Sequence, residues 1–167
     1  MSSLIAIGGV SRSGKSTLAS WLAKQLPQSI TLHQDDYVKA PSDLPLIDGL
    51  PNWEHPDSID WKAWEEAIQN ALKHHENVIL EGILVFAKAE INALINRAIY
   101  LEIDQVTFTE RRLKEKRWGE ETSTYIQHVW EAHTQYGLPS LDLNVIRVNN
   151  ITPEKYSMLL ALITPKT

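Results

Sequence analysis

Gly9-Val10-Ser11-Arg12-Ser13-Gly14-Lys15-Ser16 decides the fold, because it matches the pattern G-x-x-x-x-G-K-[ST] at every position. An apolar run at residues 4–7 precedes it, and apolar residues at helical spacing follow it over residues 15–26. In such a loop backbone N–H groups converge on phosphate oxygens, Lys15 reaches the β- and γ-phosphates, and Ser16 can hold Mg²⁺. The residues expected to contact a nucleotide are Gly9, Ser11, Arg12, Ser13, Gly14, Lys15, Ser16 and Thr17.

Short apolar runs alternate with helical patterns along the rest of the chain. The further candidate strands are residues 30–32, 78–80, 98–103 and 144–148. Candidate helices cover residues 61–72 (capped by Asp57 or Ser58), 88–95, 107–117 and 122–136, and a last one follows Thr152-Pro153. The alternation predicts an α/β class: a three-layer P-loop fold with a parallel five-stranded sheet, helices on both faces and a short helical lid.

The segment at residues 34–58 has a different character. It holds four prolines, several carboxylates and little periodicity. A connection of this length is usually functional or disordered, so we predict a long loop here. We find no hairpin in the chain.

Composition limits the classes of protein that the chain can represent. Its 167 residues predict a single domain over 1–167, with 43% hydrophobic and 22% charged residues, as in soluble globular proteins. The formal net charge of −5 disfavours nucleic acid or an anionic membrane as a partner. The absence of cysteine excludes disulfides, and the apolar run at the N-terminus is too short for a signal peptide, so we expect a cytoplasmic protein.

Carboxylates follow two of the predicted strands. Asp35 and Asp36 come after the second strand, where one of them can take the proton of an acceptor hydroxyl that attacks the γ-phosphate. The alternative is a pair of solvated loop carboxylates or a helix cap. Glu81 ends an apolar strand and is either a partner of Mg²⁺ and substrate or the first exposed residue; we favour the first.

A charged helix near residues 107–117 is the candidate lid, within approximate bounds of 105–121. It contains Arg111, Arg112 and Arg117, which alternate with glutamates. An arginine delivered by a closing lid would stabilise charge on the γ-phosphate, whereas a solvated helix face with i,i+4 pairs is an equal alternative on these residues alone. GTPase signatures of the form Asp-x-x-Gly and Asn-Lys-x-Asp do not occur, so a GTP switch is disfavoured.

The chain resembles the uridine kinase and nicotinamide riboside kinase family of P-loop nucleoside kinases. The strings that carry the resemblance are residues 9–17, Gln34-Asp35-Asp36-Tyr37 with Lys39, Asn52-Trp53-Glu54-His55-Pro56-Asp57, Glu81-Gly82-Ile83-Leu84, Arg111-Arg112 with Arg117, and His128-Val129-Trp130. The family usually has Asp where Glu54 stands.

The resemblance implies an ATP- and Mg²⁺-dependent enzyme that phosphorylates the 5′-hydroxyl of a ribonucleoside, either nicotinamide riboside or uridine and cytidine. It makes Asp35 the base, with Lys15 and Arg112 as the other catalytic residues. Glu54 would bind the ribose diol, and Glu81 would lie by Mg²⁺ and substrate together with Ser16. Further implied roles are ATP contacts for Arg111 and Arg117, a substrate contact for Arg112, and stacking on the base for Trp53 and Trp118.

Two other functions are compatible with the motifs. One is a P-loop kinase for another small alcohol, such as a sugar acid or a coenzyme precursor. The other is a non-catalytic regulator that binds ATP without transferring it. Acceptor-dependent release of ADP would separate a kinase from such a regulator.

Overall fold

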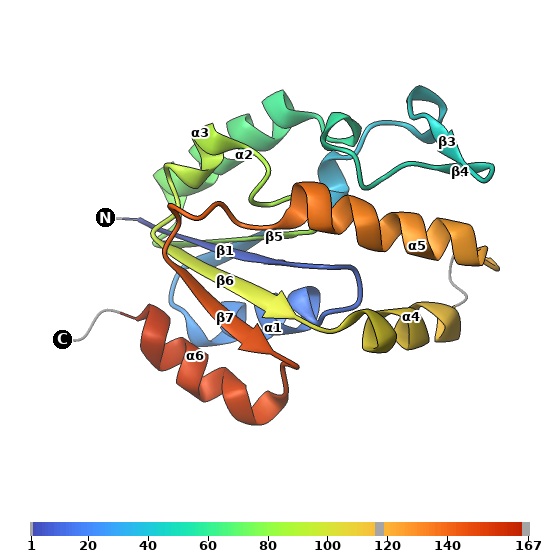
Figure 1. Ribbon diagram of the computed structural model, residues 1–167. Helices are drawn as coiled ribbons and strands as arrows, with labels where there is room; N and C mark the ends of the chain where they lie inside the picture. The colour runs from blue at the N-terminus through green and yellow to red at the C-terminus, as the bar shows by residue number, and fades with distance from the viewer. Residues whose placement is uncertain (1, 116–118, 165–167) are drawn as a thin grey trace.

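The computed structural model describes residues 2–115 and 119–164. Its centre is a sheet of five parallel strands in the order β2-β5-β1-β6-β7 (Figure 1). The strands are β1 (Ser3–Gly9), β2 (Ser29–His33), β5 (Asn77–Gly82), β6 (Arg97–Glu102) and β7 (Val145–Asn149). Each of the five predicted strands is present: β1, β2 and β5 are longer by one or two residues at each end, and β6 and β7 are shifted by one residue. The predicted fold class is confirmed.

Helices cover both faces of this sheet. On one face lie α1 (Lys15–Gln25) and α6 (Tyr156–Ile163), and on the other lie α2 (Trp61–His74), α3 (Ala89–Asn92) and α5 (Ser123–Ala132) (Figure 1). Alternate residues of β1 enter the two cores, Leu4 and Ala6 on the α2 side and Ile5 and Ile7 on the α1 side. All four side chains are at most 1% exposed, which explains why this strand is apolar without alternation.

Helix boundaries differ from the prediction where capping side chains decide them. The N-cap of α2 is Asp60, whose carboxylate accepts a hydrogen bond from the Ala63 N–H at 3.1 Å. The predicted caps Asp57 and Ser58 were wrong, because both lie in a 3-10 turn, Pro56–Ser58, that precedes the helix. Trp64, Ile68 and Ala71 are buried on the core face, as their spacing predicted.

The predicted bounds of the lid helix and of the next helix differ from the observed ones, and the predicted last helix is present after Thr152-Pro153. Helix α4 (Gln105–Lys114) begins at the Asp104 cap, and α5 ends in a π-helical turn, His133–Gly137. A 3-10 turn, Pro153–Lys155, leads into α6.

The segment at residues 34–58 is not a plain loop. It contains 3-10 turns at Gln34–Tyr37, Pro41–Asp43 and Pro56–Ser58, and an antiparallel hairpin of β3 (Leu46–Ile47) and β4 (Leu50–Pro51). The prediction of no hairpin was wrong. Asp48 and Gly49 have φ values of 49° and 77°, which a tight hairpin turn requires and which Asp-Gly adopts readily.

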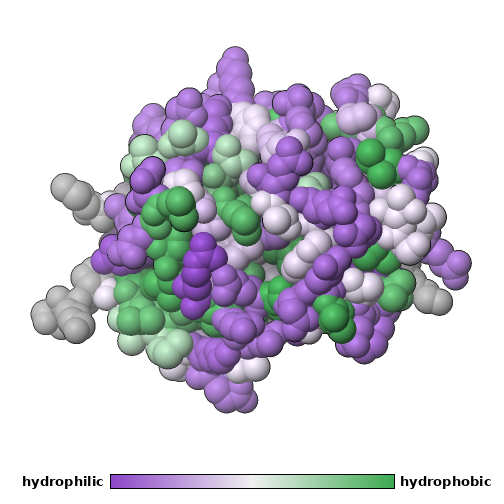
Figure 2. All heavy atoms as spheres, viewed as in Figure 1, coloured by the Kyte–Doolittle hydropathy of each residue, from purple (hydrophilic) through white to green (hydrophobic). Residues whose placement is uncertain are grey.

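The surface in Figure 2 is largely hydrophilic, with hydrophobic residues scattered over it. Within the described ranges, no helix combines the length and the apolar character needed to cross a membrane.

Candidate active site

The phosphate loop leaves the carboxyl end of β1 and leads into the first turn of α1. Gly14 adopts φ 100°, and a side chain on Gly9 would approach the carbonyl of Leu101 to 2.6 Å, so both positions require glycine. The Lys15 ammonium is buried and donates a hydrogen bond to the Val10 carbonyl at 2.9 Å. Burial lowers the pKa of Lys15, which a phosphate arriving in the loop would counteract.

Glu81 lies beside the start of α1. Parallel pairing sets Ile7 of β1 opposite Glu81 of β5, and the Ser16 hydroxyl then donates to Glu81 Oε1 at 3.1 Å. A hydroxyl and a carboxylate are oxygen ligands of the kind that Mg²⁺ accepts, and this cation usually completes its shell with water and substrate phosphates. In the described part of the chain, no cluster of three or more His, Cys, Asp or Glu side chains could hold a metal without them. The two predicted metal residues therefore fit a Mg²⁺ that arrives with a nucleotide.

Asp35 lies in the 3-10 turn that follows β2, with an exposed side chain. Gln34 holds the backbone of this turn, because its buried side chain accepts a hydrogen bond from the Leu84 N–H at 2.9 Å and packs over Gly82. Partial burial and the charge of Glu81 raise the pKa of Asp35, while Lys15 opposes the shift. A carboxylate with a raised pKa is a better proton acceptor than an ordinary surface aspartate.

Glu54 is buried, with 4% of its surface exposed, and its Oε2 has no hydrogen-bond partner. Burial raises the pKa of Glu54 to about 7, although the charge of Arg112 acts in the opposite direction. The carboxyl group borders a small cavity of about 10 Å³, enough for about one water molecule, lined by Val10, Ser11, Glu54, Ile83, Leu84, Val129 and His133. An unpartnered buried carboxyl is costly, which marks this position as one that a ligand would satisfy.

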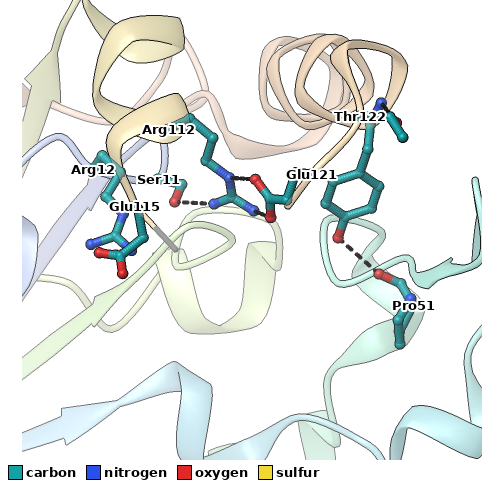
Figure 3. Close-up of polar contacts among 8 residues, drawn as sticks. Ser11, Arg12, Pro51, Arg112, Glu115, Glu121 and Thr122 are labelled. Atoms are coloured by element: carbon teal, nitrogen blue, oxygen red, sulfur yellow. Dashed lines mark hydrogen bonds and ion pairs between the residues drawn. The ribbon is translucent and has the colours of Figure 1, made fainter. Parts of the chain in front are cut away.

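Arginines of α4 contact the phosphate loop directly. Arg112 forms a two-pronged ion pair with Glu121, with distances of 2.6 and 2.7 Å, and donates to the Ser11 hydroxyl at 2.7 Å (Figure 3). Arg111 donates to the Arg12 carbonyl at 2.9 Å. These contacts argue against the alternative in which this helix is only a solvated face. Of the remaining predicted residues, Arg117 and Trp118 lie outside the described residues.

The hairpin segment is held by side chains of α5. Tyr125 donates its hydroxyl to the Pro51 carbonyl at 3.0 Å, and His128 Nε2 lies 2.9 Å from Asn52 Oδ1. These contacts hold residues 51 and 52, which directly precede Trp53 and Glu54 in the chain. The Trp53 carbonyl accepts a hydrogen bond from Ser58 at 2.8 Å, and its side chain is half-buried.

Three contacts of the site were missed in the sequence. Glu121 had no assigned role, although it pairs with Arg112. His33 had no assigned role either, yet its Nδ1 lies 2.7 Å from Glu81 Oε1. Each of the two residues directly follows the apolar run of a predicted strand, but nothing in the sequence shows that these strands pair. Asp48 accepts a hydrogen bond from Thr122 at 2.8 Å, which anchors the hairpin turn to the start of α5.

His133 has a structural role. Its Nε2 lies 2.7 Å from the Tyr100 hydroxyl, and the two rings are parallel, with centroids 5.9 Å apart. Burial lowers the pKa of His133 to about 3, so the ring is neutral in the physiological range. The imidazole therefore lines the cavity as a neutral ring packed against Tyr100.

A protein-family model described as an AAA domain matches residues 5–129. The chain belongs to the AAA domain family. Among curated proteins it is 28% identical to a uridine kinase of Borrelia garinii subsp. bavariensis, over 68% of this chain and 67% of that protein. It is 25% identical to human nicotinamide riboside kinase 2, over 81% of this chain and 68% of that protein. The resemblance drawn from the motifs is thereby confirmed.

Solved structures support the same fold. The thymidylate kinase of Candida albicans superposes with a TM-score of 0.60 at 22% identity, covering 97% of this chain and 91% of that structure.

Proposed function

We propose that the protein is an ATP-dependent nucleoside kinase that transfers the γ-phosphate of ATP to the 5′-hydroxyl of a ribonucleoside, either nicotinamide riboside or uridine and cytidine. The observation that carries this proposal is the arrangement at the carboxyl edge of the sheet. The loop with Lys15 and Ser16 faces Glu81, and beyond it stand an accessible carboxylate, Asp35, and a buried one, Glu54. A nucleotide-binding switch does not need Asp35 and Glu54, because it has no acceptor to deprotonate or to bind.

In this mechanism the loop amides and Lys15 would hold the β- and γ-phosphates of ATP. Ser16 and Glu81 would hold Mg²⁺, which would supply positive charge to stabilise the phosphate oxygens. Asp35 accepts the proton of the 5′-hydroxyl as its oxygen attacks the γ-phosphorus, and the bond to the β-phosphate oxygen breaks. Arg112, already in contact with the loop through Ser11, donates to the oxygens on which charge develops. No covalent enzyme intermediate is required.

Glu54 provides the acceptor contact. Its unpartnered Oε2 can accept a hydrogen bond from a ribose hydroxyl, which would replace the single water that its cavity can hold. The extra methylene relative to Asp extends the carboxyl toward that cavity. Trp53 would stack on the base, and Arg112 would reach both substrates.

The test is ADP formation from Mg-ATP with a panel of uridine, cytidine, nicotinamide riboside, adenosine, pantothenate and gluconate. We expect one ribonucleoside to raise the rate at least about tenfold over the acceptor-free rate, with the phosphate recovered on the 5′-oxygen. Stimulation by gluconate or pantothenate alone would reject the ribose site and retain a kinase. Bound ATP without stimulation by any acceptor would favour the regulator.

A further inference from the structure

His33 is the last residue of β2, and it stands directly opposite Glu81 in the register between β2 and β5. Its Nδ1 lies 2.7 Å from Glu81 Oε1. The Glu81 side chain is 6% exposed and that of His33 is 40% exposed, so the imidazole covers the carboxylate from the open side of the sheet. None of the sequence motifs described above gives a role to a histidine at this position.

The carboxylate is held from both of its neighbouring strands. Ser16, which follows β1 and its loop, donates to Oε1 at 3.1 Å, and His33 reaches the same oxygen from β2 at the shorter distance. An ionised carboxylate only accepts hydrogen bonds, so His33 must carry its proton on Nδ1. Both contacts converge on Oε1, and Oε2 makes no hydrogen bond within the described ranges.

We propose that His33 is a positioning residue that fixes the orientation of Glu81, so that Oε2 faces Mg²⁺ or one of its bound waters. The inference rests on the proposed function, because it assumes that a Mg-nucleotide binds between Ser16 and Glu81. Residues that hold a metal-binding group in place typically change metal affinity or activity 10- to 100-fold when they are replaced. In this role His33 acts through Glu81 and is not itself a catalytic residue.

Two substitutions separate the hydrogen bond from the bulk of the ring. His33→Leu keeps much of the volume but has no donor. His33→Asn places an amide N–H close to the position of Nδ1 and should restore the contact. His74→Leu is the matched control, because His74 is exposed at the end of α2, far along the sequence from the loop.

The experiment is calorimetric binding of a non-hydrolysable ATP analogue with and without Mg²⁺, in the absence of any acceptor. We expect His33→Leu to bind the metal-free analogue like the wild type, and to lose about tenfold of the affinity that Mg²⁺ adds. His33→Asn should lie within about threefold of the wild type, and His74→Leu should be unchanged.

Several results would overturn the proposal. One is an unchanged Mg²⁺ effect in His33→Leu. Another is an equal loss of affinity with and without the metal, which would indicate a role in packing alone. A third is His33→Asn behaving like His33→Leu. Because the assay contains no acceptor, failure of every nucleoside in the turnover panel would leave this result interpretable by itself.

Discussion

The proposed nucleotide-binding side and the proposed acceptor-binding side of the site are built in different ways. On the nucleotide side, the loop follows a strand whose central side chains are at most 1% exposed, and Lys15 donates to the loop backbone. On the acceptor side, the chain forms a hairpin of two-residue strands and short 3-10 turns, held by side chains of α5. Backbone and sheet fix the first side, and a few side-chain contacts fix the second.

In the proposed function, this difference separates the groups that transfer phosphate from the groups that select the acceptor. The proposed phosphate transfer depends on groups at or near strand ends, which are held by the sheet. The proposed recognition of the acceptor depends on Glu54 and its surroundings, which a small number of substitutions could remodel. The predictions below test this division, from the largest expected effect to the smallest.

Replacing Asp35 with Asn should reduce turnover about 10³-fold, because a neutral amide cannot take the hydroxyl proton. Affinity for ATP should stay within about twofold, since the loop and Lys15 are intact. Steady-state kinetics and nucleotide titration measure the two effects. Asp36→Asn is the control and should keep most of its activity; if the two variants lose equal turnover, Asp35 is not the base.

Glu54 should impose a pH dependence on stability that Glu54→Gln removes. Burial raises the pKa of Glu54 from 4.5 to about 7, so between these values the folded protein binds more protons than the unfolded chain. Stability attributable to this group is therefore fully present below about pH 4.5 and declines as the pH rises to about 7, by up to about 3 kcal/mol.

Urea unfolding at pH 5 and pH 8 measures this effect. The loss between the two pH values should be smaller in Glu54→Gln than in the wild type, whereas Glu120→Gln, at an exposed position, should keep the wild-type slope. An identical slope in all three proteins would show that Glu54 is not the group responsible.

Arg112→Lys keeps the charge but loses the two-pronged pair with Glu121, and we expect kcat to fall about 30-fold, equivalent to about 2 kcal/mol. Arg111→Lys should lose less, since the Arg111 side chain donates to a loop carbonyl, which a lysine ammonium can also do. Rates at saturating ATP and acceptor compare the two. A larger loss in Arg111→Lys would transfer the transition-state role to that residue.

Gly49→Ala should have the smallest effect. No atom lies within 4 Å of an added Cβ, so its cost comes from the φ of 77° alone, about 1 kcal/mol. Thermal unfolding measures the loss, and Gly49→Asn should cost less because asparagine tolerates this conformation. Equal stability of Gly49→Ala and the wild type would show that the turn relaxes without strain.

The nucleotide side could be predicted from the sequence because its signals are local. Spacing from Gly9 to Ser16 identifies the loop, and apolar runs identify the strands that flank it. The acceptor side was predicted less well. Asp48-Gly49 was a usable hairpin signal that the four surrounding prolines obscured, and its flanking strands are too short to show alternation.

Pairings between distant residues lay beyond sequence reasoning. His33 meets Glu81 through the register of the sheet, and Arg112 meets Glu121 through a tertiary contact between α4 and the residues that precede α5. Helix ends were misjudged for a related reason: the π-helical turn at residues 133–137 depends on the packing of His133 against Tyr100 and Gly137, which periodicity does not report.

The central position of β1 also has a consequence for synthesis on the ribosome. The strand that carries the phosphate loop pairs with residues 77–82 and 97–101, so it leaves the ribosome long before its neighbours exist. A nascent chain that ends before residue 97 contains the whole phosphate-loop motif. It lacks β6, however, which is one of the two strands that pair with β1. Such late, non-local pairing is slow, so we expect the ability to bind ATP to emerge only after synthesis has passed residue 101.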